Sequence, residues 1–475
     1  MKRMRTGPAA LAAAAALSQS GAASSIEITS LVLQGDDLPT VGLVTSIDNL
    51  AINDNGDWIV EVDTNNEDTN SDGALIRSGL LYLREGQPLT APAGAFLGSF
   101  DTININNNGR SGWNFFLDGL PSTQDSGVYW GDSLLIAESA VATAPEFSPG
   151  TPYIGFFEVK INNADDLMIM ASVDDPAINS SVDRALVRVT LNPDGTLATE
   201  SVLAKEGDVL PGQVGPVTDF STGPHEFAFN DAGQTMFVAH INAGTDTHSI
   251  YIDDVKVAQD DEESPVPGRP WSSLSSAKLD LNDAGQYVFT GSLSGDTASN
   301  SIIVSSGGVV KQEGDPIGGF AFTGFGTAPV QISRQGRVLW YGAWNNTVST
   351  NNEGIFLDDE LLVEEGVTFI NGEVVFAIRG VQDSFQMSDS GRYIIFEAVL
   401  ASGIQGAFQI EVSYCPGDLS GGPEVGLADL ATLLSAFGSC AGDAAYIPHA
   451  DFNFDGCIGL ADLAVVLSAF GETCP

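Results

Sequence analysis

Short apolar runs alternate with polar turns along most of the chain. From residue 26 to about residue 412 many runs follow a period of two, as in Gln286–Phe289 after the turn at Asn282–Gly285. A period of two places alternate side chains on opposite faces of a strand. Asn, Asp and Gly tolerate the positive φ angles of tight hairpins. The pattern therefore predicts a large, mainly β domain built from hairpins.

Two short sequences mark a repeat. The first is an apolar residue, a polar turn and usually a Gly, at Ile52–Gly56, Ile105–Gly109, Ile161–Asp165, Phe229–Gly233, Leu281–Gly285, Ile332–Gly336 and Met387–Gly391. The second follows an apolar run and contains a Gly beside an acid or Gln, at Leu33–Pro39, Arg84–Leu89, Lys205–Pro211, Gln312–Pro316 and Glu364–Gly366. The units lie roughly 50 to 68 residues apart, which favours four-stranded blades of a β-propeller.

The ends of the repeat predict how the ring closes. Residues 26–33 form one apolar strand ahead of the first unit, and the last unit stops after residues 408–412 without its second marker. If the first strand completes the last blade, no sheet edge stays free. We therefore predict a seven-bladed β-propeller over residues 24–413. Six or eight blades, an open β-solenoid or two β-sandwiches are the alternatives.

The N-terminus and the charge indicate an exported protein, secreted or at the cell surface. Residues 1–23 combine a basic start, a short apolar run and small residues, the pattern of a signal peptide. A disordered Ala-rich start is the alternative. No segment is long enough to predict a transmembrane helix. The net charge of −44 disfavours nucleic acid and anionic lipid and suits divalent cations or a basic partner.

Near the C-terminus, a loop–helix unit occurs twice at an offset of 33 residues. Gly426–Gly438 and Gly459–Gly471 carry Leu and Ala at helical spacing and end in Gly, which predicts two helices. The loop before the second helix, residues 451–462, has oxygen-bearing side chains at positions one, three, five and twelve and Gly at six. Calcium requires that arrangement. The candidate ligands are Asp451, Asn453, Asp455, the backbone carbonyl of Cys457 and Asp462.

A polar turn that caps the helix is the alternative to this calcium site. The first loop, residues 418–429, keeps Asp418 and Asp429 and has Ser420 as a weak third ligand. It lacks the acid at position five and the Gly at position six. We therefore predict that this loop binds Ca²⁺ more weakly or not at all.

The paired loops resemble a dockerin, in the cysteine-bearing form of planctomycete-type exported proteins, over residues 414–475. The resemblance implies two antiparallel helices with pseudo-twofold symmetry, folding that depends on Ca²⁺, and docking onto a cohesin. Family recognition residues occupy loop positions ten and eleven, here Leu427, Ala428, Leu460 and Ala461. These pairs are more apolar than the Ser/Thr pairs of the best-known dockerins, so the expected partner is a cohesin-like or other cell-surface protein.

All four cysteines lie in the same segment. An even number in an exported chain favours disulfides, and no pair has the C-x₂₋₄-C spacing of the alternative, a zinc site. A helix of ~16 Å separates Cys415 from Cys440, too far for a Cα separation of ~6 Å. The antiparallel helices that the resemblance implies predict the pairs Cys415–Cys474 and Cys440–Cys457.

Two classes of function remain. The propeller is a non-catalytic binding or scaffold domain, or it is a carbohydrate-active hydrolase with paired carboxylates and a glycan substrate. No catalytic residue is assigned, because no nucleophile motif surrounds the four histidines, His225, His240, His248 and His449. Four glutamates recur at matching positions, Glu85, Glu206, Glu313 and Glu365. Their recurrence predicts a structural role in a turn. The alternative is that the four glutamates form a ring that lines a binding site for a cation or a sugar.

Overall fold

The computed structural model describes the repeat region almost completely and the C-terminal segment in part. It describes residues 26–178, 182–242, 244, 246–348, 351–412, 415, 417–419, 424–440, 445–447, 450–452 and 457–473. The predicted signal peptide, residues 1–23, lies outside these ranges and stays a prediction. Within these ranges, no helix has both the length and the apolar character needed to cross a membrane.

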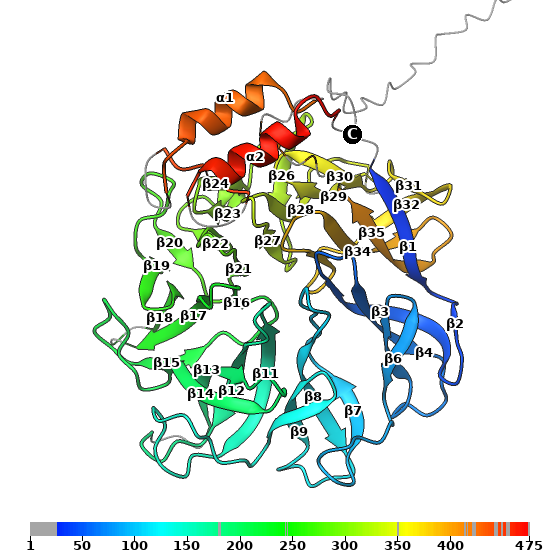
Figure 1. Ribbon diagram of the computed structural model, residues 1–475, viewed down its shortest axis with the longest axis vertical. Coiled ribbons are helices and arrows are strands. Elements are labelled where there is room, and N and C mark those ends of the chain that lie inside the picture. Colours follow the sequence, from blue (N-terminus) through cyan, green and yellow to red (C-terminus); the bar gives the residue numbers. More distant parts are fainter. Residues whose placement is uncertain are drawn as a thin grey trace, which may run out of the picture.

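Seven antiparallel sheets form a ring of blades (Figure 1). Blade 1 consists of β2 (Asp37–Leu38), β3 (Gly42–Ile52), β4 (Trp58–Thr64), β5 (Gly73–Arg77) and β6 (Leu80–Arg84). Blade 2 consists of β7 (Phe96–Phe100), β8 (Gly112–Asp118), β9 (Ser126–Trp130) and β10 (Ser133–Ala137). Blade 3 consists of β11 (Tyr153–Ile161), β12 (Leu167–Val173), β13 (Asp183–Leu191) and β14 (Leu197–Lys205).

The remaining blades have a more broken first strand. Blade 4 consists of β15 (Val217–Phe220), β16 (Phe227–Phe229), β17 (Thr235–Asn242), β18 (Asp246–Ile252) and β19 (Val255–Gln259). Blade 5 consists of β20 (Trp271–Ser273), β21 (Leu279–Leu281), β22 (Tyr287–Leu293), the 3₁₀ turn η1 (Thr297–Ser299), β23 (Ser301–Ser305) and β24 (Gly308–Gln312). Blade 6 consists of β25 (Pro316–Ile317), β26 (Phe320–Gly324), β27 (Val330–Ile332), β28 (Val338–Trp344), β29 (Glu353–Leu357) and β30 (Glu360–Glu364). Blade 7 consists of β31 (Phe369–Ile370), β32 (Glu373–Ile378), β33 (Phe385–Met387), β34 (Tyr393–Leu400), β35 (Gln405–Glu411) and β1 (Glu27–Leu33).

The predicted ring closure is confirmed. Strand β1 pairs antiparallel with β35, with Glu27 opposite Glu411 and Leu33 opposite Gly406. The first strand in the chain is thus the outermost strand of the last blade. The mainly β, seven-bladed propeller predicted from the two markers is therefore the observed fold.

The core lies between neighbouring blades, which pack face to face. One apolar cluster joins Val238 and Ile250 of blade 4 to Trp271 and Phe289 of blade 5. A middle strand is consequently covered on both faces, and all seven residues of β12 are buried. This explains why some middle strands are continuous apolar runs instead of alternating ones.

Two helices follow the propeller, α1 (Leu427–Ala436) and α2 (Leu460–Ala469), as the repeat predicts. They lie side by side (Figure 1) and share one apolar core, which contains Leu433 of α1 and Val466 of α2. Isolated antiparallel bridges join Glu424 to Thr473 and Cys440 to Cys457. The start of each helix therefore lies beside the end of the other, which is the antiparallel arrangement that the family resemblance implies.

Candidate functional site

The first marker of each blade forms a turn at the propeller axis that also holds the next blade. In blade 1, Asn53 Oδ1 accepts hydrogen bonds from the amides of Asn55 and Asp57, at 3.0 and 2.9 Å. Asn53 Nδ2 donates to the carbonyl of Asn106 in blade 2, at 2.9 Å. The same link to the next blade is made by Asn106, Asn162, Asn230 and Asn282. Asn suits this position because its amide both accepts and donates.

Blades 6 and 7 have Ser333 and Ser388 at the position of the marker Asn. The residues directly after the Asn or Ser of each blade form a second set of links, which we call the axial ring. Its members are Asp54, Asn107, Asn163, Asp231, Asp283, Arg334 and Asp389. The amide of Asp54 donates to Asn107 Oδ1 at 2.9 Å, and equivalent bonds join blades 2 to 5. The amide of Ser390 donates to Asp54 Oδ1 at 2.6 Å. The axial ring thus joins the last blade to the first a second time, independently of β1.

Arg334 is the cation of this ring. Its guanidinium lies 3.5 Å from Asp54 Oδ2, 3.6 Å from Asp283 Oδ2 and 4.0 Å from Asp231 Oδ2. Burial, with repulsion from Asp54 and Asp231, raises the pKa of Asp389 to about 8. Burial and repulsion from Asp231 also raise the pKa of Asp283. One basic side chain therefore offsets four acidic ones.

A cavity of about 140 Å³ lies along the axis next to the ring. We call it the axial chamber. It is lined by the residues two positions before each marker Asn or Ser in five blades, namely Asn104, Lys160, Asp280, Gln331 and Gln386. Gln331 Oε1 accepts from the amide of Met387 at 2.6 Å, and Asp280 Oδ2 accepts from Ile332 at 2.7 Å. These side chains are thus fixed by the backbone of the next blade.

An ion pair crosses the channel at the chamber. His225 Nε2 of blade 4 lies 2.9 Å from Asp383 Oδ1 of blade 7, on the other side of the ring. Burial would raise the pKa of Asp383, but its hydrogen bond to His225 and the charges of His225 and Lys160 lower it. Both residues have left-handed backbones, with φ of 59° and 61°. Such φ values are uncommon for residues other than Gly and are often found at functional sites.

Further carboxylates surround this pair. Glu158 Oε1 lies 2.5 Å from Lys160 Nζ, whereas Glu158 Oε2 is buried and makes no hydrogen bond. Burial, followed by repulsion from Asp383, raises the pKa of Asp48. Burial also raises the pKa of Asp101, with repulsion from Glu158 and Asp383. Asp48, Asp101, His225 and Asp383 all stand five positions before a marker Asn or Ser. Aligning the repeats in the sequence would have revealed this set.

The recurring glutamates have the structural role predicted for them. Glu85 accepts from the amide of Gly73 at 2.9 Å, and Glu206 accepts from Arg184 at 2.8 Å. Glu313 and Glu365 accept from Ser301 and Asn352 in the same way. Each carboxylate therefore fixes the start of the third strand of its own blade, far from any common ring.

These glutamates predict a pH dependence of stability. Burial raises the pKa of Glu206 and of Glu365 from 4.5 to about 7. At pH values between the unfolded pKa of 4.5 and the folded pKa of about 7, the folded state thus binds more protons than the unfolded state. The free energy of unfolding therefore falls as the pH rises from about 5 to 8. We expect a loss of roughly 1 kcal/mol at Glu206, which is partly exposed, and at least as much at the buried Glu365. Urea unfolding at several pH values measures it.

The variant Glu206→Gln provides the control, because the Gln carbonyl can still accept the Arg184 amide but does not titrate. Its stability should fall less between pH 5 and 8 than that of the wild type. Equal slopes in both proteins would show that Glu206 is not a source of the dependence.

Two histidines meet in blade 4. His240 and His248 are opposite each other on β17 and β18, with ring centroids 4.5 Å apart. His248 Nδ1 lies 2.6 Å from Asp260 Oδ2, and His240 Nε2 lies 3.1 Å from Ser221 Oγ. The hydroxyl of Ser221 donates to the carbonyl of Ser275 at 2.7 Å. Its proton is thus directed away from His240, unlike that of an activated serine. His449 lies outside the described residues.

The C-terminal loops use their last Asp identically. Asp462 Oδ1 accepts from the amide of Phe452 and Oδ2 from Gly459, both at 2.7 Å. Asp429 accepts from Leu419 and Gly426 in the same way, at 2.8 and 2.7 Å. Both carboxylates are fully buried. Each Asp therefore closes its own loop from position twelve to positions two and nine.

The other predicted ligands are only partly described. Asp451 is buried and accepts a hydrogen bond from Tyr446 at 2.8 Å. Asp418 and Cys457 are described, whereas Asn453, Asp455 and Ser420 lie outside the described residues. Among the described residues no cluster of three or more His, Cys, Asp or Glu could hold a metal ion.

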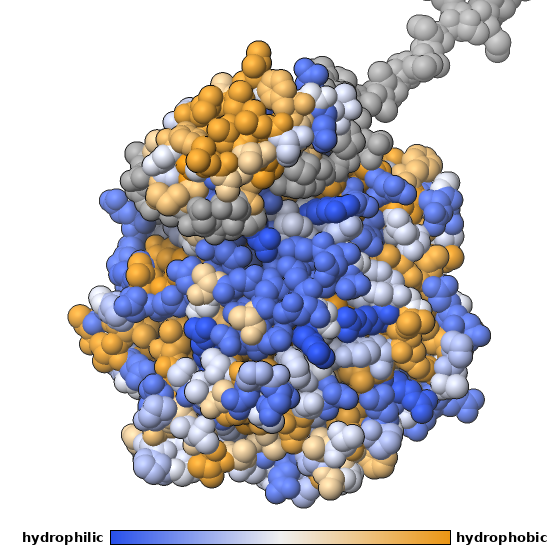
Figure 2. Space-filling model, viewed as in Figure 1, coloured by the Kyte–Doolittle hydropathy of each residue, from blue (hydrophilic) through white to orange (hydrophobic). Residues whose placement is uncertain are grey.

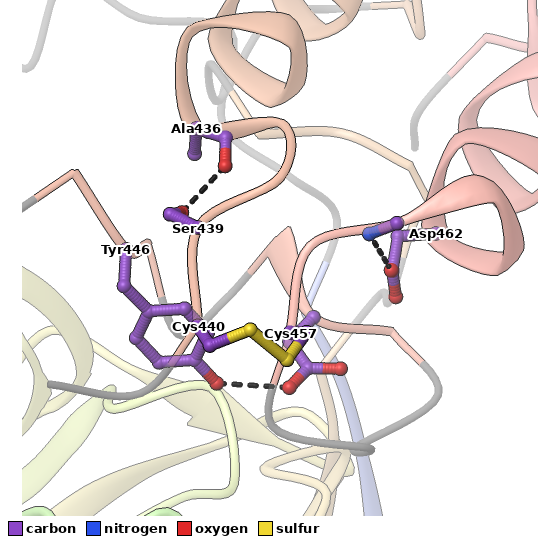
Figure 3. The surroundings of a disulfide bond; sticks show 8 residues. Ala436, Ser439, Cys440, Tyr446, Cys457 and Asp462 are labelled. Atoms are coloured by element: carbon purple, nitrogen blue, oxygen red, sulfur yellow. Dashed lines mark hydrogen bonds between the residues drawn. A yellow bond between two sulfur atoms is a disulfide. The ribbon is translucent and has the colours of Figure 1, made fainter. Parts of the chain in front are cut away.

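A disulfide joins Cys440 to Cys457, one of the two predicted pairs (Figure 3). It connects the end of α1 to the loop before α2. The other predicted pair, Cys415–Cys474, stays a prediction because Cys474 lies outside the described residues. The observed bond keeps the two units adjacent whether or not a metal is bound.

The helices expose matching apolar residues. Leu427 and Leu460 are 76% and 77% exposed, and Ala428 and Ala461 are exposed beside them. Further exposed pairs are Leu434 with Leu467 and Phe437 with Phe470. Figure 2 shows hydrophobic residues gathered over the helices, next to a hydrophilic area over the centre of the same face. The predicted recognition residues thus belong to an accessible apolar surface.

Fold and site together define a seven-bladed β-propeller with an axial chamber and a C-terminal pair of loop–helix units. The chain belongs to a family of unknown function (DUF7453), whose model matches residues 14–260, more than half of the sequence. No curated protein matches the chain.

Solved propellers are only distantly similar. TolB from Acinetobacter baumannii aligns with a TM-score of 0.31 and 11% identity, over 77% of this chain and 78% of TolB. A Trypanosoma rangeli sialidase aligns with a TM-score of 0.31 and 10% identity, over 82% of this chain and 60% of the sialidase. Similarities of this size say nothing about activity.

Proposed function

We propose that the protein is an exported, non-catalytic binding or scaffold protein, attached through a Ca²⁺-dependent, dockerin-like C-terminal module. The partner is a cohesin-like or other cell-surface protein. One observation carries the proposal. In each of the two loops, the Asp at position twelve is buried and accepts hydrogen bonds from the backbone amides at positions two and nine of its own loop.

The charges of the module support a bound cation. Asp429, Asp451 and Asp462 are buried, and no Lys or Arg follows Arg392 in the sequence. Buried carboxylates need paired charges, hydrogen bonds or a metal. Each oxygen of Asp462 accepts one backbone amide, which orients the carboxylate at position twelve of the loop. The residues therefore fit a hard, oxygen-seeking ion such as Ca²⁺.

In the second loop, Asp451, Asn453, Asp455, the carbonyl of Cys457 and Asp462 would hold the ion. The ion would neutralise the acidic loop and so favour its folding. Asp462 orients the loop through the amides of Phe452 and Gly459. The ordered loops then hold Leu427 and Leu460 on the accessible face of the helix pair, where a partner with an apolar surface can bury them.

Calorimetric titration of the full chain with CaCl₂ tests the proposal, after treatment with a chelator. We expect uptake of Ca²⁺ and a higher melting temperature, and neither effect from equal MgCl₂. Binding to isolated cell envelopes should need Ca²⁺ and should be lost in the double variant Leu427→Arg/Leu460→Arg. No uptake of Ca²⁺, or binding that persists in chelator, would refute the proposal.

A carbohydrate-active hydrolase remains the alternative. A screen of polysaccharides for both binding and release of reducing ends, with and without Ca²⁺, separates the two. Turnover of any glycan by the purified chain would favour the hydrolase.

A further inference from the structure

We propose that the axial chamber is a binding site for a small organic cation with several N–H donors, such as a diamine or a guanidinium compound. The site is distinct from the C-terminal module and goes beyond its proposed docking role. Three features of the molecule support such a ligand: the carboxylates near the chamber, the lysine already inside it and the ion pair that crosses the channel.

Acidic groups outnumber basic ones around the chamber. Asp48, Asp101 and Asp383 occupy the same position in blades 1, 2 and 7, which are neighbours in the closed ring. Asp280 of blade 5 lines the chamber, whereas Glu158 of blade 3 and Asp383 lie behind its wall, bonded to the lining residues Lys160 and His225. The basic groups are Lys160 and His225. Lys278 is paired with Glu226 at 3.2 Å and Arg379 with Glu397 at 2.9 Å, and Arg334 lies among the aspartates of the axial ring. The chamber thus carries an excess of negative charge.

The structure shows how an ammonium group is held there. Lys160 lines the cavity, and its Nζ lies 2.5 Å from Glu158 Oε1. The side chain of Glu158 is only 5% exposed, and its second oxygen, Oε2, makes no hydrogen bond to the protein. A buried carboxylate oxygen without a donor is unfavourable, because it has lost its bonds to water and gained none in the protein. A ligand that brings a further N–H donor would remove this cost.

The carboxylates are too widely spread for a bare metal ion. They come from five different blades, and no three acidic, His or Cys side chains among the described residues could hold one metal. The cavity of about 140 Å³ has room for about five water molecules, at the ~30 Å³ that each occupies in the liquid. A compact organic cation with donors at both ends can reach carboxylates on different blades, whereas a metal ion cannot.

The pair His225–Asp383 lies where such a ligand would pass. It crosses the channel between opposite blades, and both residues have left-handed backbones. The axial ring borders the same cavity, through Asn163, Asp231, Asp283, Arg334 and Asp389. We infer that the ligand enters on the side of the ion pair, because Arg334 and its hydrogen-bonded neighbours occupy the ring side.

Calorimetry of the full chain with putrescine and agmatine tests the inference. The matched neutral probe is 1,4-butanediol, which has nearly the length of putrescine but no charge. Chelator is present throughout, so that a failure of Ca²⁺ binding cannot affect the result. We expect both cations to bind and the diol not to bind. No heat from either cation at millimolar concentration, or equal binding of the diol, would overturn the proposal.

Two variants locate the site. Glu158→Gln removes one charge without changing the size of the side chain and should weaken putrescine at least tenfold, as loss of a charged hydrogen bond predicts. Asp101→Asn should act in the same direction, and it serves if Glu158→Gln fails to fold. The control Asp254→Asn changes an exposed acid between β18 and β19 and should leave the affinity unchanged. Equal affinity in all these proteins would assign the binding to the acidic outer surface and refute a chamber site.

Discussion

Replacing Arg334 by Ala is expected to lower the free energy of unfolding by about 3 kcal/mol at pH 7.5. The guanidinium lies within 4.0 Å of three aspartates, and all four side chains are less than a third exposed. Without it, the axial ring keeps its carboxylates and loses its cation. Removing one partner of a largely buried ion pair costs more than the pair contributes, because the remaining charges stay desolvated.

Urea unfolding measures this loss, and Arg337→Ala is the matched control. Arg337 bonds Asp358 at 2.9 Å, but both side chains are more than a third exposed. Such surface pairs contribute about 0–1 kcal/mol. If the two substitutions cost the same, Arg334 does not balance the charges at the axis.

The pH dependence adds a second check. With the pKa of Asp389 already at about 8, protonation of the ring at lower pH relieves the repulsion that Arg334 would otherwise offset. The loss of stability caused by Arg334→Ala should therefore be smaller at pH 5 than at pH 8. A loss that grows toward acid would contradict this explanation.

The turns could be predicted because each depends on residues close together in the chain. The closing strand could be predicted because the repeat begins with one extra strand and ends one strand short, although its partners, such as Glu27 and Glu411, are far apart in the chain. The marker at Leu281–Gly285 sets its own hairpin through side-chain bonds within four residues, such as that from the Gln286 amide to Asn282 Oδ1. The bond from Asn282 Nδ2 to Ser333 spans 51 residues. Only the closed ring brings those two residues together, so the second role of the Asn was not apparent from the sequence.

The role of Arg334, in the least regular marker, also depends on contacts that form only in the closed ring. Ile332–Gly336 is a weak copy of the marker, with Arg334 where other blades have Asp or Asn. In the ring, this departure supplies the cation between Asp54, Asp231 and Asp283. A residue that weakens a local pattern can thus be the one that makes the assembled ring stable. Similarly, His225 and Asp383 are 158 residues apart and meet only because blades 4 and 7 face each other.

In the C-terminal module, the repeated sequence predicted both helices, and the family resemblance implied their antiparallel order and, with it, the Cys440–Cys457 bond. The repeat also identified Asp462 and Asp429 as equivalent residues, each at position twelve of its loop. It could not reveal that each binds two amides of its own loop, because those bonds depend on how the loop folds back onto its helix. These bonds allow the calcium proposal to be tested residue by residue.

Replacing Asp462 by Asn should remove the stabilisation of the module by Ca²⁺. Ca²⁺ at one hundred times its dissociation constant stabilises a folded binding site by about 2.7 kcal/mol. Asn lacks the charge and offers one acceptor oxygen, so one of the amides of Phe452 and Gly459 also loses its acceptor. That second effect costs about 1–3 kcal/mol with or without metal. Thermal unfolding of the full chain, in chelator and in Ca²⁺, separates the two contributions.

Two further variants serve as controls for Asp462→Asn. Asp429→Asn makes the equivalent change in the first loop, where it removes the acceptor of one of the amides of Leu419 and Gly426. That loop has Gly422 and Pro423 at positions five and six, so the substitution should reduce the Ca²⁺ effect much less. Glu472→Gln removes an exposed charge after α2 and should keep the full Ca²⁺ effect. If Asp462→Asn still gains as much stability from Ca²⁺ as the wild type, the buried Asp is only a helix-capping group and the loop before α2 is not the metal site.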